Sequence, residues 1–193
     1  EKLGMEIHRF ARPPEELSSG DPYFEQLQAM LAIRDELANI PLCEIQRDML
    51  LSMENVLESA WSFRNTLIPN RCMNPNNISE VVYYFLQDKG IEYRGDLLYE
   101  RAKAEFDARM EELAALPPQK ILDHAYEKIV KEDFLCHLKN GLNEWEIDVL
   151  LSYQQPLAAL YTEWMEIDHS YLDLEQIYDT AKQVAGKRLN ELR

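Results

Sequence analysis

The chain has 193 residues, and 35 acidic side chains against 20 basic ones give it a formal net charge of −15. A negative field of this size repels phosphate backbones and anionic lipids, which argues against direct binding to nucleic acid or to a membrane surface. The longest apolar run, residues 81–86, is far too short to cross a bilayer.

Apolar residues recur at helical spacing through most of the chain, and period-two runs of β-branched residues are nearly absent. This pattern predicts an all-α protein, a multi-helix bundle of about eight helices. Residues 1–20 read as an irregular N-terminal arm, because prolines and Ser-Ser-Gly interrupt regular structure. The remainder forms either one domain or two small ones, an N-terminal helical subdomain at 21–95 and a C-terminal helical domain at 96–193.

The first two helices are expected between residues 21 and 67. Asp21-Pro22 marks the start of one, as an N-cap followed by a proline in the first turn. Pro41 opens the next, whose apolar stripe over residues 42–67 is the longest in the chain. The stripe is typical of one helix in an intramolecular bundle; a coiled-coil seam that forms a homodimer stays open as the alternative.

A third helix is predicted from the capping-box spacing of Asn77 and Glu80. Gly90 is expected to end it, and residues 91–95 are the best candidate for an interdomain joint. Asp96, just after a glycine, then reads as the N-cap of the next helix.

A helical hairpin over residues 98–138 organises the C-terminal half. Its joint is Leu116-Pro117-Pro118, because Pro117 disfavours helical dihedrals at Leu116 while Pro118 fits a first helical turn. The apolar positions of its two helices are Leu98, Ala102, Phe106, Met110 and Leu113, then Ile121, Leu122, Ala125, Ile129, Val130, Phe134, Leu135 and Leu138. The short joint predicts antiparallel neighbours, and Gly141 supplies a left-handed stop.

Three more helices are expected after the hairpin. Asn143 and Glu146 repeat the capping-box spacing, with Trp145 facing inward. Pro156 begins the next helix, and a break at residues 168–170 precedes the last one.

Three cysteines, Cys43, Cys72 and Cys136, lie far apart with no Cys-x-x-Cys pair. An odd number at such spacing predicts reduced thiols rather than a disulfide framework. Cys136 is expected to be a small packed side chain. Because the sequence also opens without a secretory signal pattern, we expect a cytoplasmic protein.

The sharpest metal-like spacing is Glu166-x-x-His169, which on one helix places both side chains on one face. Carboxylate-bridged di-iron bundles need two such motifs and two further glutamates, whereas one motif is visible here. His137, four residues after Asp133, is a further weak candidate ligand. The favoured interpretation is that Asp168 or Ser170 caps the following helix and that the histidines are boundary residues. No metal or other cofactor is therefore expected, and no catalytic residue is assigned.

Aromatic residues are more informative, since they bury much area at small entropic cost. Tyr83, Tyr84, Tyr161, Trp164 and Tyr171 are the candidates for contact with a protein partner. The alternative for each is a core position whose polar atom reaches a partner.

Residues 97–190 resemble an uncharacterised helical domain found in mobile elements of gut Firmicutes. The proline joint at 116–118 and the Tyr161-x-x-Trp164 pair carry the resemblance most specifically. Further matching blocks lie at residues 99–100, 102–105, 119–122, 125–128, 131–133, 150–152, 156–157, 160, 163, 168 and 170–173. The resemblance implies a small cytosolic accessory protein and supplies no catalytic residues.

Helical patterning without a catalytic constellation predicts a non-enzymatic, acidic interaction protein that binds a protein partner. The resemblance adds an accessory role in a mobile genetic element. Two other classes stay open. The acidic helices could mimic nucleic acid and inhibit a host defence or regulatory protein, or the histidines could serve a metal-dependent helical-bundle enzyme.

Overall fold

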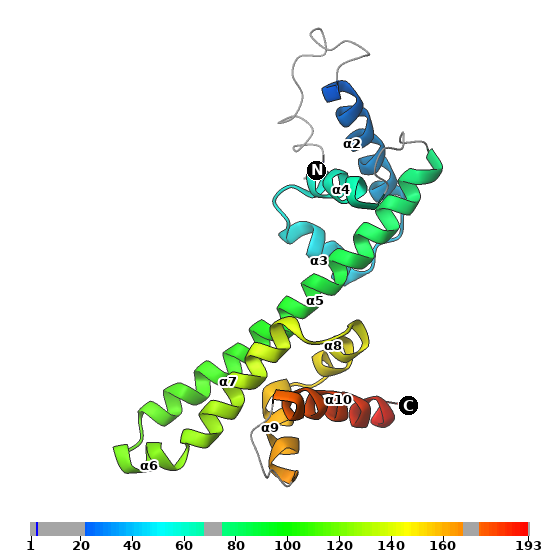
Figure 1. The fold of residues 1–193 in the computed structure, drawn as a ribbon. Helices are drawn as coiled ribbons and strands as arrows, with labels where there is room; N and C mark the ends of the chain where they lie inside the picture. Colours follow the sequence, from blue (N-terminus) through cyan, green and yellow to red (C-terminus); the bar gives the residue numbers. More distant parts are fainter. Residues whose placement is uncertain (1–2, 4–21, 68–74, 168–173, 193) are drawn as a thin grey trace. The chain divides into compact units, whose positions relative to one another are not determined.

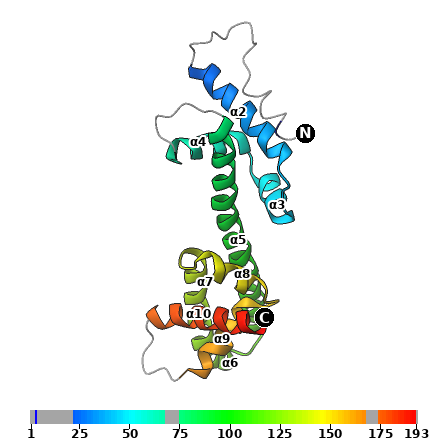
Figure 2. The same cartoon turned by 90° about the vertical axis from the view of Figure 1, so that its right-hand side faces the viewer.

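The computed structural model describes residue 3 and residues 22–67, 75–167 and 174–192 (Figures 1 and 2). In these ranges the regular structure consists of nine helices, which confirms the predicted all-α class. No helix there has both the length and the apolar character needed to cross a bilayer. Residues 1–90 and 91–193 form two compact units, and each is described by itself.

Within its described residues, the first unit contains three helices and the beginning of a fourth. They are α2 (Pro22–Asn39), α3 (Glu44–Ser52), α4 (Val56–Leu67) and α5 (Pro75–Ala114), which continues into the second unit. Helix α2 packs against α4, and Phe63 on α4 meets Phe85 on α5 edge to face at 5.9 Å. The core residues are Ala29, Met30, Ile33, Leu37, Met49, Leu50, Val56, Leu57, Ala60, Val81, Val82, Phe85 and Leu86.

The single helix predicted after Pro41 is wrong, because α3 and α4 are separated at residues 53–55. Met53 adopts an extended conformation with ψ of 138°. The Ser52 hydroxyl donates a hydrogen bond to the Met49 carbonyl at 2.7 Å, and the Asn55 carbonyl accepts the first bond of α4 from Ser59. Such local bonds favour helix ends over helix interiors. A continuous coiled-coil seam over 42–67 is therefore not formed.

Gly90 does not end a helix, contrary to the prediction. Helix α5 runs unbroken through Gly90, through the expected joint at 91–95 and through Asp96, the expected N-cap. A glycine inside a helix costs only about 1 kcal/mol relative to alanine. Buried positions before and after it, such as Phe85 and Leu98, outweigh that cost. The boundary between the two units thus lies inside a helix.

The second unit is built on the remainder of α5. Its other helices are α6 (Pro118–Asp123), α7 (Ala125–Asn140), α8 (Glu144–Leu151), α9 (Pro156–Glu166) and α10 (Leu174–Glu191). Helix α7 returns alongside α5, as the hairpin prediction requires, and Arg109 on α5 donates a hydrogen bond to Glu127 on α7 (Figure 1). Helix α10 packs against α7, α8 and α9. One core cluster joins all of these helices except α6. Within it, the rings of Phe134 and Trp164 lie edge to face at 5.9 Å.

Helix α8 is fixed to α5 by two arginines. Arg94 reaches Glu144 at 2.7 Å and Asp148 at 2.8 Å, and Arg101 donates to the carbonyl of Leu151 at 2.7 Å. The capping box of α8 is present as predicted, with Asn143 and Glu146 exchanging hydrogen bonds of 2.9 and 3.1 Å.

Several local predictions in the second unit are wrong. The helix after the proline joint is interrupted at His124, whose ψ of 6° separates α6 from α7. Gly141 is right-handed, with φ of −118°, and its role is steric: a Cβ there would collide with the His137 ring. Cys136 and Trp145, expected to be packed, are both exposed.

Candidate protein-contact surface

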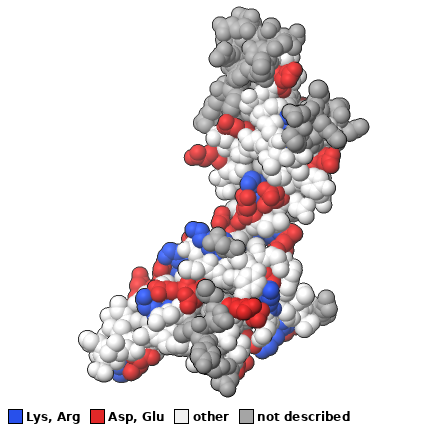
Figure 3. Space-filling view, viewed as in Figure 1, with Lys and Arg blue, Asp and Glu red and all other residues white. Residues whose placement is uncertain are grey.

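Four large apolar side chains that are close together in the sequence are exposed on α6 and α7. They are Ile121, Leu122, Tyr126 and Ile129, with exposures of 39%, 67%, 40% and 49%. We call these four residues the α6–α7 face. The hairpin pattern predicts Ile121, Leu122 and Ile129 on the buried stripe, so this part of the prediction is wrong. Figure 3 shows the surface at α6 as largely uncharged, with a few charged side chains beside it.

The reason for this exposure lies in the helical phase of α7. Val130, Phe134 and Leu138, spaced by four residues, enter the core and are almost completely buried. Ile129 is rotated by about 100° from Val130, so it points away from that core. A helix with more apolar residues than one stripe can bury has a second apolar side, which is typical of contact surfaces.

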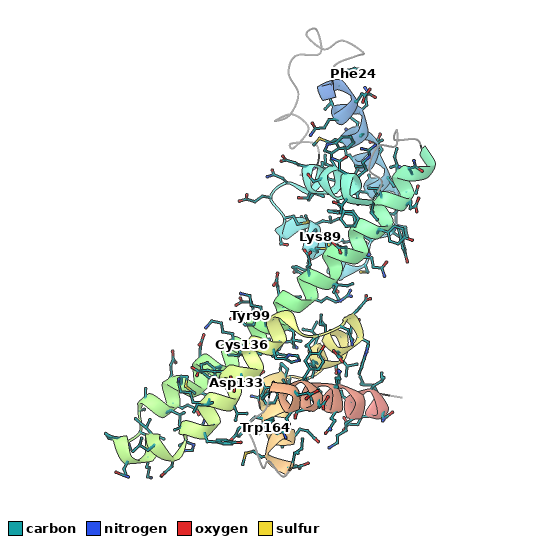
Figure 4. All side chains as sticks on the ribbon, viewed as in Figure 1. Phe24, Lys89, Tyr99, Asp133, Cys136 and Trp164 are labelled. Carbon is teal, nitrogen blue, oxygen red and sulfur yellow. The ribbon has the colours of Figure 1, made fainter. Side chains whose placement is uncertain are left out.

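Tyr126 is anchored to the core by a hydrogen bond from a buried side chain. The indole N–H of Trp164 on α9 donates a hydrogen bond of 2.9 Å to the Tyr126 hydroxyl. Trp164 itself is completely buried, so it is a core residue here and presents no surface to a partner (Figure 4). The next residue of α9, Met165, is 57% exposed. The tyrosine ring is therefore pre-positioned at the surface.

A buried carboxylate fixes α7 against α5 next to the α6–α7 face. Glu127 accepts two hydrogen bonds from Arg109, at 3.0 and 3.1 Å, and one from Lys131 at 2.7 Å. His124 Nδ1 lies 3.1 Å from the same carboxylate, at the residue where the helix is interrupted. The hydrogen bonds from Arg109, reinforced by Lys131, lower the pKa of Glu127 to about 2. The network thus holds the start of α7 in one position.

Glu105 on α5 secures the start of α9. Its carboxylate accepts hydrogen bonds from the backbone N–H groups of Leu157 at 3.4 Å and Ala158 at 3.0 Å. Gln155, the N-cap residue of α9, makes no side-chain cap bond, so another helix performs this role. Burial raises the pKa of Glu105. A cavity of about 210 Å³ lies beside it, between Arg109, Lys131 and the first turn of α9.

The other aromatic candidates are found in different settings. Tyr83 and Tyr84 on α5, in the first unit, are 63% and 43% exposed, with their rings edge to face at 5.3 Å. Tyr161 is half-buried under the Lys131 ammonium, which lies 5.0 Å from its ring centre, and burial raises its pKa. Tyr171 falls outside the described residues.

The candidate metal ligands are not brought together in the described part of the chain. Glu166 is the exposed last residue of α9, and His169 falls outside the described residues. His137 packs its ring against Tyr178 at 4.4 Å, and its buried Nε2 has no hydrogen-bond partner among the residues that the structure describes. Burial lowers the pKa of His137, while nearby Glu146 opposes that shift. No group of three or more His, Cys, Asp or Glu side chains among the described residues could hold a metal ion.

Sequence reasoning therefore missed Tyr126 and selected Trp164 in its place. The two residues form one hydrogen-bonded pair, in which the tryptophan is inside and the tyrosine outside. The signal that could have found the surface is the excess of apolar residues on α7, where Ile129 and Val130 are adjacent and cannot both enter one core.

The C-terminal half of the chain matches a known protein family. Residues 94–188 match a family described as "Protein of unknown function (DUF3848)". No curated protein and no solved structure matches the chain. The matched residues include the α6–α7 face and all of α6 to α9. This match is consistent with a domain of unknown function that covers part of the chain, as the resemblance in its C-terminal half predicts.

Proposed function

We propose that the chain is a non-enzymatic interaction protein that binds a protein partner through the α6–α7 face. The observation that supports this most directly is the exposure of Ile121, Leu122, Tyr126 and Ile129 within two consecutive helices. Burying such side chains against a partner contributes about 25 cal/mol for each Å² of apolar surface removed from water.

The support behind this surface makes it suitable for binding. Tyr126 is tied to Trp164, and the adjoining Glu127 is tied to Arg109 and Lys131. A side chain that is already ordered loses less entropy when a partner covers it, so more of the contact energy remains for affinity. A tyrosine at the centre of such a surface is a frequent binding hot spot.

The resemblance to mobile-element domains supports a biological role in a mobile genetic element. In that setting the chain is an accessory factor that acts by docking onto another protein in the cytoplasm. The binding role then belongs to the second unit, where the family match lies.

Site-specific photo-crosslinking tests the proposal. A photoreactive phenylalanine analogue is placed at Leu122 and, as a matched control, at Leu51 of the first unit, because both side chains are 67% exposed. We expect a discrete crosslinked species from position 122 in extract of the native host, identified by mass spectrometry and lost when Ile129→Ser is added. The same products from both positions, or none from 122, would contradict the proposal.

A further inference from the structure

We propose that the occupant of the α6–α7 face is an amphipathic α-helix that carries Lys or Arg beside its apolar side. This inference rests on the proposed function and specifies the chemistry of the partner. It follows from three observations: the helical spacing of the face, the carboxylates that border it and the net charge of the chain.

The spacing of the face matches a helix as its partner. Tyr126 and Ile129 lie three residues apart on α7, a spacing at which side chains of one helix pack against another helix. Leu122 lies on α6, before the interruption at His124. Helix α7 already contacts α5 through Arg109 and Glu127, and packs against α9 and α10. Its apolar side at Tyr126 and Ile129 is what remains, so a further helix laid there would extend the existing bundle.

The charges beside the face favour a basic partner. Asp123 adjoins Leu122, and Asp133 lies one turn beyond Ile129 on α7 (Figure 4). Neither carboxylate has an ion-pair partner among the residues that the structure describes. Glu132 is already paired with Lys128 at 2.8 Å.

One cation, Lys120, also lies on α6, and it has no ion pair with any described residue. Counted against the described part of the chain, two unpaired carboxylates and one unpaired ammonium leave the border acidic. A partner helix with Lys or Arg next to its apolar residues would complement it.

The same charges argue against a second copy of this chain. A twofold contact would place identical patches opposite each other, and so bring the Asp123 and Asp133 carboxylates of both copies together. Each copy also carries a net charge of −15. Repulsion between two such molecules opposes their association, whereas the same field attracts a basic helix.

Isothermal titration calorimetry with synthetic helical peptides tests the inference on the full chain. The probe is a Leu/Ala/Lys peptide of about 18 residues with one apolar stripe. One control peptide has every Lys replaced by Glu. The other has the same composition in scrambled order, without a stripe. Circular dichroism of each protein variant verifies its folding.

Two pairs of variants locate the binding site. Leu122→Ser/Ile129→Ser removes apolar surface from the face, and Leu51→Ser is the control at an equally exposed leucine. Asp123→Asn/Asp133→Asn removes the bordering charges, and Glu58→Gln/Glu80→Gln removes two exposed carboxylates from the first unit.

We expect the basic striped peptide to bind, and the Leu122/Ile129 variant to bind it at least about tenfold more weakly. The Asp123/Asp133 variant should weaken binding severalfold more than its control. Equal binding of the acidic peptide, or equal effects of variant and control, would overturn the inference. So would a dimer, detected by sedimentation, that Leu122→Ser/Ile129→Ser dissociates.

The two proposals fail differently. A partner crosslinked from position 122, together with no binding of the basic peptide, would leave the proposed function standing and reject only the basic helix. Absence of both results would reject both proposals.

Discussion

Glu127 is the residue on which the geometry of α7 depends most. Its side chain is only 11% exposed, and it receives hydrogen bonds from Arg109 on another helix and from Lys131 on its own. Without the carboxylate, both cations would lose their shared acceptor in a poorly hydrated place. Such a loss costs more than the removal of a surface ion pair.

Replacement of this carboxylate by an amide should therefore be measurable in both stability and its pH dependence. We expect Glu127→Gln to lower the free energy of unfolding at pH 7 by about 1–3 kcal/mol. In the wild type the pKa of Glu127 is lowered from 4.5 to about 2 on folding. The stabilisation is thus fully present above pH 4.5 and is lost as the pH falls toward 2.

Urea denaturation followed by circular dichroism at several pH values measures this effect. The variant should show a flatter decline between pH 4.5 and 2 than the wild type. If the free energies of unfolding of the two proteins fell in parallel with pH, the ionisation of Glu127 would make no contribution to the pH dependence of stability.

Gly141 is a position at which any side chain would collide with a neighbouring ring. We expect Gly141→Ala to destabilise the protein by about 1–3 kcal/mol, because the new Cβ would collide with the His137 ring. Gly186→Ala is the matched control, since a Cβ at Gly186 meets nothing within 4 Å. That variant should gain about 0.5–1 kcal/mol from helix propensity.

Thermal unfolding of both alanine variants and of His137→Ala/Gly141→Ala checks the steric cause. Removal of the ring should recover part of the loss caused by Gly141→Ala, as a coupled pair does in a double-mutant cycle. Strict additivity of the two changes would show that the ring is not the obstacle.

At the scale of elements, α9 depends on α5 for its first turn. We expect Glu105→Ala to cost about 1 kcal/mol or more, the usual effect of removing an N-terminal cap, and Glu105→Gln to cost less. The amide keeps one acceptor oxygen for the Ala158 N–H, the shorter of the two cap bonds. Chemical denaturation of the two variants gives the comparison, and equal losses would argue against a capping role.

Some element boundaries were predictable from local signals, whereas the local signals at Gly90 and Asp96 were overridden within α5. The Asn143–Glu146 capping box and the starts of α6 and α9 at Pro118 and Pro156 follow from residues within one helical turn. The interruption at His124 does not, because it involves a contact of His124 with Arg109 on α5, fifteen residues away. Likewise, continuation of α5 through Gly90 depends on tertiary burial on either side.

The candidate surface was predictable only in part. Counting apolar residues on α7 reveals more than one buried stripe can hold, yet the phase of the helix is set by packing of Val130 and Phe134. Sequence alone therefore indicates that an apolar side is left over without showing which residues form it. The prediction of Trp164 as a contact residue, where the structure exposes Tyr126 instead, is wrong for the same reason: packing sets which side of each helix is buried.

At the scale of the whole molecule, the family match and the compact units coincide closely. The matched residues, 94–188, lie within the second unit, 91–193, and so do all members of the Phe134–Trp164 core cluster. A unit with its own core is expected to fold alone.

We therefore expect a fragment of residues 91–193 to fold independently. It should show helical circular dichroism, cooperative thermal unfolding and dispersed methyl resonances in its nuclear magnetic resonance spectrum. Secondary structure without a cooperative transition would instead indicate that residues 1–90 are required for the core to order.

The hydrogen bond between Trp164 and Tyr126 has a practical consequence. The chain has three tryptophans, and the other two, Trp61 and Trp145, can be replaced by phenylalanine to leave one indole. That indole is shielded from water and joined directly to a ring at the outer surface. A ligand that shifts the Tyr126 hydroxyl would change the wavelength and yield of the indole emission, so the protein contains its own dye-free optical reporter of occupancy.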